Sequence, residues 1–272
     1  MTGSIWAMPF FAGKTVVITG GTTGIGNGIA MAFAEAGAIV HATGATAAEV
    51  AAARAYGTAV SYSVLDVRDM TAVEGYSSQF TSVAALVNCA GVNLRAAEFT
   101  VQGFETVVDI NLTGSMRSAS AFRGALSNGG AIVNIASMFA FFGAAHAPAY
   151  AASKGAIVQL TKSLAIAYAG DGIRVNALAP GWIETAMTAA PRADPVRNAE
   201  LMKRTPMGRW GTPGDLTGPA LFLCSPLAGF ITGAILPVDG GYLIAEALAM
   251  LRDRSPSLCR RDQDRTRPID HA

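Results

Sequence analysis

Cysteine and histidine are scarce in this chain, whose 272 residues include three of each. The cysteines, Cys89, Cys224 and Cys259, are odd in number, and no two of them have the C-x-x-C spacing. Such scattered thiols do not make a disulfide framework, and no group of Cys, His and Asp has the spacing of a metal site. We therefore expect reduced thiols in a cytoplasmic protein and predict no bound metal.

Charge is scarce as well, since charged residues make up 14% of the chain and the net charge is +1. This balance gives no indication of nucleic acid or an anionic membrane as a partner. The N-terminus lacks the basic region and apolar stretch of a signal peptide. The longest apolar stretch, Ala131–Ala147, contains Asn134, Ser137 and Gly143 and is shorter than the roughly 20 residues of a membrane-spanning helix.

Hydrophobic residues, by contrast, make up 51% of the sequence, enough for the core of one large α/β domain. We predict this single domain over residues 12–251, after an N-terminal extension of residues 1–11. The last segment, residues 252–272, contains six arginines, four aspartates and almost nothing apolar. Because such a composition cannot build a core, we expect a charged, disordered tail there.

Short apolar runs alternate along the chain with segments whose apolar residues recur at helical spacing. The runs predict strands at Thr15–Thr19, Ile39–Ala42, Val60–Leu65, Ala84–Asn88, Ala131–Ile135, Val175–Ala179 and Ile235–Val238. The spacing predicts helices at Gly24–Ala36, Ala47–Tyr56, Asp69–Phe80, Val101–Leu126 with an interruption near Asn111, Tyr150–Tyr168, and after Thr212. Strands in which apolar and polar residues do not alternate are typical of a parallel sheet with helices on both faces. The fold class is therefore α/β, a doubly wound parallel sheet with helices on both faces.

A glycine-rich turn joins the first strand to the first helix, with the sequence Thr19-Gly-Gly-Thr-Thr-Gly-Ile-Gly26. Glycines let the backbone turn tightly and approach a pyrophosphate closely. The helix that follows presents free N–H groups and the positive end of its dipole. The position of the turn between strand and helix predicts a dinucleotide site.

The end of the second strand, His41–Thr46, contains no carboxylate. In dinucleotide-binding folds an Asp or Glu in this region binds the adenosine ribose, and it would repel the 2′-phosphate of NADP. Gly44 and Ala45 leave room, while no lysine or arginine stands there to pair with the phosphate. We predict a slight preference for NADP(H) over NAD(H).

Further motifs follow the other strands in order. Asn88-Cys-Ala-Gly91 follows the fourth strand, Ser137 the fifth, and Pro180-Gly181 the sixth, while Tyr150-Ala-Ala-Ser-Lys154 gives Y-x-x-x-K. Together with Asn111 and the glycine turn, this set resembles the short-chain dehydrogenase/reductase family over residues 12–243. The C-terminal part is similar to the family's 3-oxoacyl reductases and sugar-alcohol dehydrogenases.

The resemblance implies a Rossmann-type catalytic domain that interconverts a secondary alcohol and a ketone with NAD(P)(H). Tyr150 and Lys154 lie one helical turn apart, and an ammonium near a phenol lowers the pKa of the phenol. By resemblance, Tyr150 transfers the proton, Ser137 holds the reacting oxygen, and Lys154 also holds the nicotinamide ribose. Asn111 supports a water that relays protons to Lys154.

The resemblance also implies a cofactor-binding set. Asp66 contacts the adenine amino group, and the segment after the sixth strand holds the nicotinamide amide so that the pro-S hydride is transferred. The full set is Gly20, Thr22, Thr23, Gly24, Ile25, Gly26, Gly44, Ala45, Asp66, Val67, Asn88, Ala90, Gly91, Tyr150, Lys154, Pro180, Gly181, Ile183 and Thr185.

The substrate is expected near Met138–Phe142, Trp182 and Asn93–Arg95, under a mobile lid with a short helix over residues 186–206. These walls are mainly apolar and aromatic, so we expect a medium-sized, largely uncharged ketone or alcohol. Arg95 is either a surface residue or a group that recognises an acidic substrate. His146 is expected at the entrance or on the surface.

Several alternatives stay open. Asn111 could kink its helix, and Asp66 could cap or pair within a turn. The whole chain could be a catalytically silent dinucleotide sensor or scaffold, although such proteins usually lose Tyr, Lys or Ser from the active set. An epimerase or dehydratase would need a separate C-terminal substrate domain, which this chain lacks. The resemblance further implies a homotetramer, formed through two long helices and the last strand.

Overall fold

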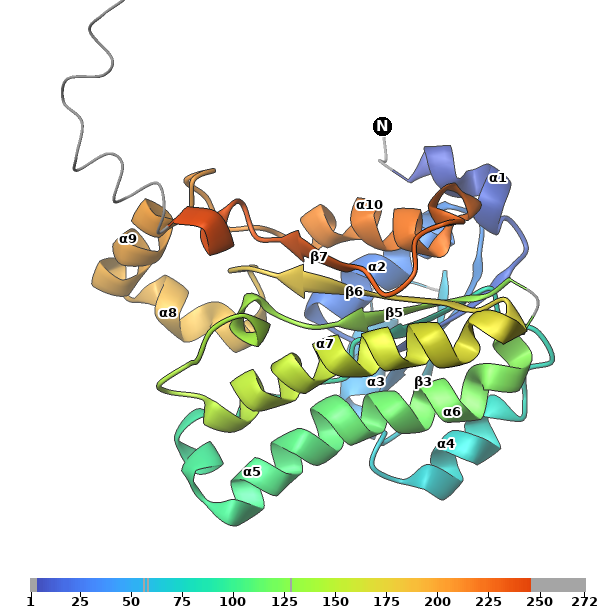
Figure 1. Cartoon of the computed structure of the whole chain (residues 1–272), viewed down its shortest axis with the longest axis horizontal. Coiled ribbons are helices and arrows are strands. Elements are labelled where there is room, and N and C mark those ends of the chain that lie inside the picture. The colour runs from blue at the N-terminus through green and yellow to red at the C-terminus, as the bar shows by residue number, and fades with distance from the viewer. Residues whose placement is uncertain (1–3, 56, 58, 128, 246–272) are drawn as a thin grey trace, which may run out of the picture.

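The computed structural model describes residues 4–245, apart from residues 56, 58 and 128. Within this part of the chain, seven parallel strands form one sheet in the order β3-β2-β1-β4-β5-β6-β7 (Figure 1). Their bounds are β1 Thr15–Thr19, β2 Ile39–Gly44, β3 Val60–Val64, β4 Ala85–Asn88, β5 Ala131–Ile135, β6 Arg174–Pro180 and β7 Ile235–Val238. The predicted doubly wound parallel sheet is confirmed, and its strand order reverses between β1 and β4. The predicted tail, residues 252–272, lies outside the described residues.

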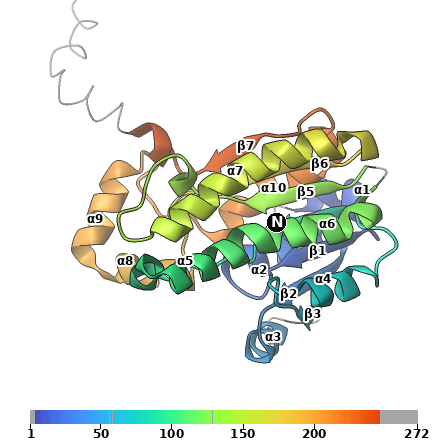
Figure 2. The same ribbon diagram turned by 60° about the horizontal axis from the view of Figure 1, so that its bottom comes forward.

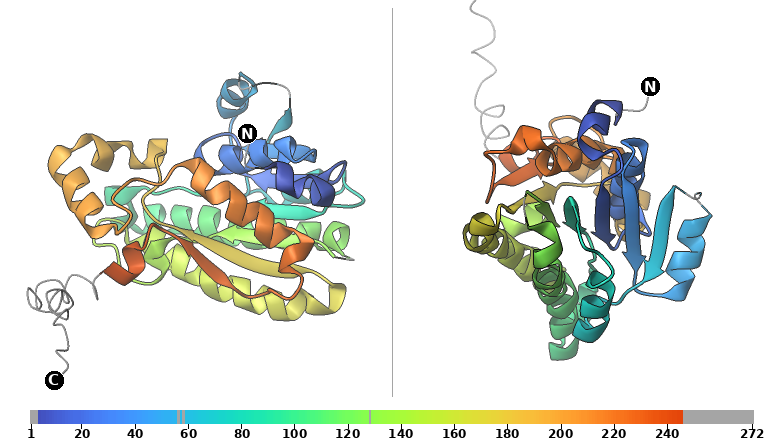
Figure 3. Two further views of the ribbon diagram at one scale, coloured as in Figure 1. Left: turned by 90° about the horizontal axis from the view of Figure 1, so that it is seen from above. Right: turned by 90° about the vertical axis from the view of Figure 1, so that its right-hand side faces the viewer.

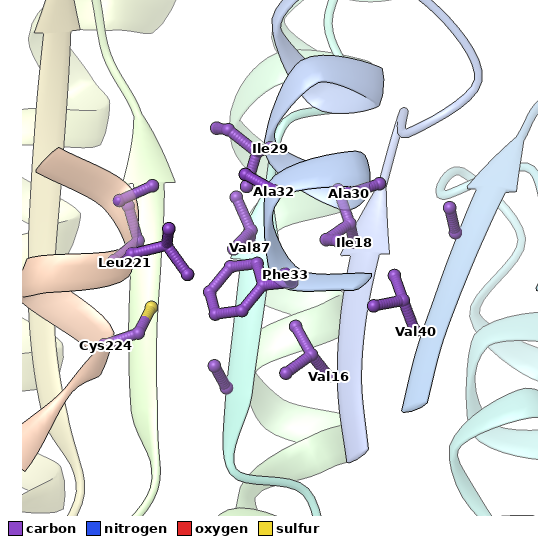
Figure 4. Packing of buried hydrophobic residues seen from close by; sticks show 14 of the residues in the cluster. Val16, Ile18, Ile29, Ala30, Ala32, Phe33, Val40, Val87, Leu221 and Cys224 are labelled. Carbon is purple, nitrogen blue, oxygen red and sulfur yellow. The ribbon is translucent and has the colours of Figure 1, made fainter. Parts of the chain in front are cut away.

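Helices cover both faces of the sheet (Figures 1 and 2). One face carries α2 (Gly24–Glu35), α3 (Ala47–Arg54) and α10 (Pro213–Cys224), and the other carries α4 (Met70–Ser77), α6 (Gly114–Leu126) and α7 (Pro148–Tyr168). Phe33 of α2 is fully buried beside Val16 and Ile18 of β1 (Figure 4). Apolar burial on both faces explains why the strands have no polar alternation.

The N-terminal segment packs against the same core. The short turn η1 (Ile5–Ala7) leads into α1 (Met8–Phe11), and both Ala7 and Phe11 are buried. The ring of Phe11 meets that of Phe33 edge-on, with 4.9 Å between centroids. Residues 5–11 of the segment that we set apart as an extension therefore pack against the core on one face of the sheet.

The long helical region after β4 is interrupted where the sequence predicts it. Helix α5 (Val101–Val108) passes through a π-helical turn, η3 (Asp109–Thr113), into α6. Asn111 is buried at the centre of that turn. Because π turns occur mostly inside α-helices at functional sites, the interruption directs attention to Asn111.

The carboxyl ends of the strands face the end of the molecule where two short helices lie (Figures 1 and 3). These are α8 (Ala189–Ala193) and α9 (Pro195–Arg204), which follow the turn η6 (Ala186–Thr188) and form the lid segment. Leu201 of α9 is buried in a cluster with Met138 and Trp210. No helix among the described residues is long and apolar enough to span a bilayer.

Candidate active site

A phosphate cradle lies between β1 and α2. Gly20 has φ +65°, and a Cβ there would lie 2.6 Å from backbone atoms of Ala90. At the start of α2, the N-cap Thr23 makes no side-chain capping bond, so it leaves the N–H groups of the first turn unsatisfied by a cap. Close backbone approach and an uncapped helix N-terminus fit the pyrophosphate of a dinucleotide.

A cavity of about 280 Å³ extends over this cradle. All but four of the cofactor-binding residues predicted from the sequence line it. The predicted residues that line the cavity are Gly20, Thr22, Thr23, Gly24, Ile25, Gly26, Gly44, Ala45, Asp66, Val67, Ala90, Gly91, Tyr150, Lys154 and Thr185.

Four predicted residues do not line this cavity. Asn88 is buried beneath it and donates from its amide to Asn134 and to the carbonyl of Ser115. Gly181 lines a second, neighbouring cavity and Ile183 lines a third, while Pro180 ends strand β6 and lines none of these three. The segment after β6 therefore lines all three cavities, since Thr185 belongs to the first.

A residue that we did not predict, Glu49, lies beside the end of β2. Glu49, in the first turn of α3, lines the cofactor cavity. Its Oε2 accepts hydrogen bonds from the backbone of Ala45 (2.8 Å) and Thr46 (3.4 Å). A Cβ on Gly44 would lie 3.0 Å from the same oxygen. The T-x-x-E capping box from Thr46 to Glu49 was the signal in the sequence.

Asp66 lies in the cavity wall but already has a partner. Its carboxylate forms an ion pair with Arg68, with 2.6 Å between the nearest atoms. The hydrogen bond from Arg68 is the main reason why the pKa of Asp66 is lowered. The structure thus contains the local pairing that we left open, and it also places Arg68 in the cavity wall.

Tyr150 and Lys154 both line the cavity from α7, and Lys154 Nζ lies 5.6 Å from the centroid of the Tyr150 ring. Burial raises the pKa of Tyr150 to about 12, while a hydrogen bond with Ser137 opposes that rise. Our expectation of a lowered Tyr150 pKa is therefore wrong for the protein chain by itself. The reason is that burial disfavours the phenolate more than the surroundings favour it.

Lys154 is buried too, and burial lowers its pKa to about 8. Its Nζ donates to the carbonyl of Ile135 at 2.6 Å, which aims the ammonium between the end of β5 and the tyrosine. A lysine with a pKa this close to neutrality can give up a proton more readily than a surface lysine.

Asn111 connects three segments from the π turn. Its Nδ2 donates to the carbonyl of Val92 (3.0 Å) and to Ser153 Oγ (3.1 Å), and its Oδ1 accepts from the Val92 N–H (2.8 Å). A Cβ on Gly91 would lie 3.3 Å from Asn111 Oδ1 and 3.6 Å from Lys154 Nζ. Asn111 is therefore adjacent to the tyrosine–lysine pair and holds the loop after β4.

A second cavity, of about 730 Å³, shares Tyr150 with the first and also contains Ser137. Phe139 and Trp182 form part of its wall, and residues of the lid segment line it as predicted. Arg95 lines it too, and its Nη2 donates to the lid carbonyl of Met187 at 2.9 Å. The cavity is thus a substrate-sized space beside the proposed proton donor.

Two cationic side chains and a histidine line this second cavity. Arg197, which our sequence reasoning missed within the lid, lines it together with Arg95 and His146. Burial lowers the pKa of His146, and the positive charges of Arg95 and Arg197 lower it further. Asp194, the acidic residue in the lining, uses its Oδ1 to cap α9. The cavity wall is thus less apolar and more cationic than we expected.

Comparisons with known proteins agree with this geometry. A family model described as enoyl-(acyl carrier protein) reductase matches residues 20–243. The 2-dehydro-3-deoxy-D-gluconate 5-dehydrogenase of Bacillus subtilis is 40% identical over 85% of this chain and 95% of its own length.

Solved structures are similar over the same span. A protein from Beutenbergia cavernae, assigned as an NAD(P)-dependent gluconate 5-dehydrogenase and solved with NADP, has a TM-score of 0.79 and 42% identity over 86% of this chain and 98% of that one. A gluconate 5-dehydrogenase from Burkholderia cenocepacia, in complex with NADP and tartrate, has a TM-score of 0.80 and 33% identity over 86% of this chain and 96% of that one. These likenesses confirm the resemblance drawn from the motifs, and the chain belongs to the short-chain dehydrogenase/reductase family.

Proposed function

We propose that the protein is an NAD(P)-dependent dehydrogenase or reductase acting on a hydroxyl or keto group of a sugar acid. The observation that carries the substrate class is the pair Arg95 and Arg197, which line the same cavity as Ser137 and Tyr150. Guanidinium groups bind carboxylates through paired, charge-assisted hydrogen bonds. Relatives named for gluconate and dehydrogluconate substrates support the same class.

The chemistry at the reacting oxygen falls to Tyr150 and Ser137. With a pKa of about 12, Tyr150 carries its proton at neutral pH and can donate it to a carbonyl oxygen during reduction. In the reverse direction the phenolate accepts the hydroxyl proton, and NAD(P)⁺ held in the first cavity would supply the acceptor for the hydride on the carbon that bears this hydroxyl. Ser137 hydrogen-bonds the oxygen and fixes its position, and the ammonium of Lys154 favours the phenolate.

For the cofactor we propose a slight preference for NADP(H). Gly44 and Ala45 line the cavity without a large side chain, and similar proteins that were solved with NADP support this choice. Tyr150, Lys154 and Thr185 line the cavity where the nicotinamide is expected, and Asn111 lies beside the lining residue Gly91.

We also propose that the protein works in a reducing compartment such as the cytoplasm and that it forms a homotetramer. The free thiols of Cys89 and Cys224 fit a reducing compartment, and burial raises the pKa of each. Large apolar side chains are exposed on the outer helices, among them Val101 of α5 and Ile166 of α7. Such exposure fits association through these helices.

The substrate class is tested by following absorbance at 340 nm with each cofactor. We expect turnover of gluconate, keto-gluconates or dehydrodeoxygluconate, and weaker turnover of the uncharged polyols sorbitol and galactitol. Arg197→Gln should raise KM for the acids about tenfold and leave KM for the polyols unchanged. Equal effects on acids and polyols would contradict the carboxylate assignment.

The reaction mechanism is tested by Tyr150→Phe, which removes only the phenolic hydroxyl. We expect kcat to fall about 100- to 10,000-fold, because general acid–base catalysis contributes on that order. Cofactor affinity, measured by quenching of protein fluorescence, should stay within twofold of the original value. Substantial turnover by this variant would rule out Tyr150 as the proton-transferring residue.

A further inference from the structure

Glu98 is a buried carboxylate that the chemistry above does not use. It lies in the turn η2 (Arg95–Phe99) after β4, and 2% of its surface is exposed. Among the described residues, Glu98 and Lys154 are the buried side chains of the Asp, Glu, Lys and Arg types. Burial of a carboxylate costs free energy unless hydrogen bonds satisfy its oxygens. The contacts of Glu98 therefore indicate what the residue stabilises.

One carboxylate oxygen holds the helix that carries Tyr150. Helix α7 begins at Pro148, and its N-cap Ala147 has no side chain able to cap it. Glu98 Oε2 accepts a hydrogen bond from the backbone N–H of Tyr150 at 2.9 Å, from 52 positions away in the chain. Glu98 thus replaces the missing local cap, and it does so at the proposed proton donor itself.

The other oxygen holds the substrate-binding loop. Glu98 Oε1 accepts from the backbone N–H groups of Leu94 (2.9 Å) and Arg95 (3.2 Å). Arg95 has φ +50°, a conformation that non-glycine residues rarely adopt. Its N–H is shared between Glu98 Oε1 and Asn93 Oδ1 (3.0 Å), and these two acceptors together keep it in place. From that position the Arg95 guanidinium reaches the lid carbonyl of Met187 at 2.9 Å.

We propose that Glu98 is a positioning residue that joins the substrate-binding loop and lid to the backbone of Tyr150. This inference rests on the proposed function, because it assigns Glu98 a role in placing the proton donor. The connected groups run from Met187 through Arg95 and Glu98 to Tyr150. Arg95 and Met187 line the same cavity as Tyr150. A substrate bound in this cavity would therefore lie against Met187 and Tyr150, the first and last of the connected groups.

The charge of Glu98 has a separate effect on Tyr150. The ionisable or polar groups that face this phenol are Ser137 after β5, Cys89 after β4, Lys154 on α7 and Glu98 on η2. The negative charge of Glu98 adds to the burial that raises the pKa of Tyr150. Removal of that charge lowers the tyrosine pKa, so alcohol oxidation, which needs the phenolate, should reach its maximal rate at lower pH.

Two substitutions separate the effect of the length of the Glu98 side chain from the effect of its negative charge. Glu98→Gln keeps the length of the side chain and loses the charge, while Glu98→Asp keeps the charge and is too short to hold both segments. We expect kcat to fall about 10- to 100-fold in both variants with KM for the cofactor within twofold, since small misplacements of a reacting group have effects of this size. The pH of half-maximal oxidation should move down in Glu98→Gln and stay in place in Glu98→Asp.

The matched control is Glu105→Gln, which removes the same charge from an exposed position on α5. It should leave kcat and the pH profile unchanged. A Glu98→Gln enzyme with the original kcat and pH profile would overturn the proposal. A kcat loss in both Glu98 variants without any change in the pH profile would reduce Glu98 to a structural cap and overturn it as well.

A measurement on the unaltered protein covers the case in which the variants fail to fold. Amide hydrogen exchange in the peptide over residues 147–152 should be slow at Tyr150, although N–H groups in a first helical turn normally exchange fast. Fast exchange at Tyr150 would overturn the proposal. This result is independent of turnover, so an enzyme that is active as Tyr150→Phe would refute the proposed mechanism without deciding the role of Glu98.

Discussion

One carboxylate, that of Glu49, lies beside Gly44 in the wall of the proposed cofactor cavity. Glu49 reaches the backbone N–H groups of Ala45 and Thr46 from the next helix. Those N–H groups would otherwise be free to bind a phosphate, and a carboxylate at the same place repels one. The charge of Glu49 therefore opposes binding of the 2′-phosphate of NADP and acts against the proposed preference for NADP(H).

From this opposition we predict that Glu49→Gln raises the ratio of NADP to NAD affinity on the order of tenfold, because it removes one negative charge from beside the phosphate. Glutamine keeps an oxygen for the capping box, so α3 should stay folded. Binding of 2′,5′-ADP and ADP to the protein, measured by calorimetry, reports the change without any turnover. Glu74→Gln on α4, outside this cavity, is the control of equal charge. Equal gains in the two Glu variants would mean that overall charge, and not Glu49, sets the preference.

Among single residues, those that belong to local motifs could be predicted from the sequence. Residues that enter the site from distant segments of the chain could not. Tyr150, Lys154 and the glycine turn belong to local patterns, so their placement follows from neighbours in the chain. Glu98 contacts Tyr150 from 52 positions away, and Arg197 enters the cavity from the lid. No periodicity or spacing encodes such contacts, because they depend on how separate elements pack.

At the scale of elements, the π turn η3 places the Asn111 side chain where it bonds the loop after β4. Asn111 satisfies both backbone groups of Val92 and also donates to Ser153 on α7. Both readings of Asn111, a break in the helix and a member of the site, are therefore compatible with one side chain. The π turn itself confirms that the helical pattern is interrupted there.

Loss of the Asn111 amide should be costly for this reason. We predict that Asn111→Ala lowers the free energy of unfolding by about 1 to 3 kcal/mol, since it leaves the partly buried N–H and carbonyl of Val92 without their hydrogen-bond partner. Urea denaturation followed by circular dichroism measures the loss. Gln102→Ala, an exposed change on the adjoining helix α5, should shift the free energy by less than about 0.5 kcal/mol. A similar small shift in Asn111→Ala would show that the loop finds other partners.

The bounds of three strands were predicted to the residue from their apolar runs. Strands β1, β5 and β7 begin and end at the residues that we expected. The N-terminal helix α1 was missed because its four residues carry too short a pattern to show helical spacing. Its role depends on Phe11 meeting Phe33, a contact that becomes visible only once α2 is placed on the sheet.

For the whole molecule, the distribution of exposed apolar side chains bears on the proposed association of subunits. Val101 and Phe104 on α5, Met116 on α6 and Ile166 on α7 are all exposed in the isolated chain. Helices α5 and α7 pack side by side on one face of the sheet (Figure 2). The prediction of a homotetramer through these helices rests on the family resemblance, and the exposed side chains supply a physical reason for it.

The assembly can be tested by one charged substitution on this face. Ile166 is 81% exposed, so Ile166→Glu should leave the folded chain intact while placing a carboxylate in the expected interface. A buried, unpaired charge opposes association, and we predict that the variant dissociates to dimers or monomers where the original protein is a tetramer. Light scattering at micromolar concentration measures the mass of each. Val196→Glu on the lid helix α9, where Val196 is 70% exposed, introduces the same charge away from α5 and α7 and should remain tetrameric. If Ile166→Glu keeps its tetrameric mass, the subunits must meet through another face, and the exposed residues around β7 become the next surface to alter.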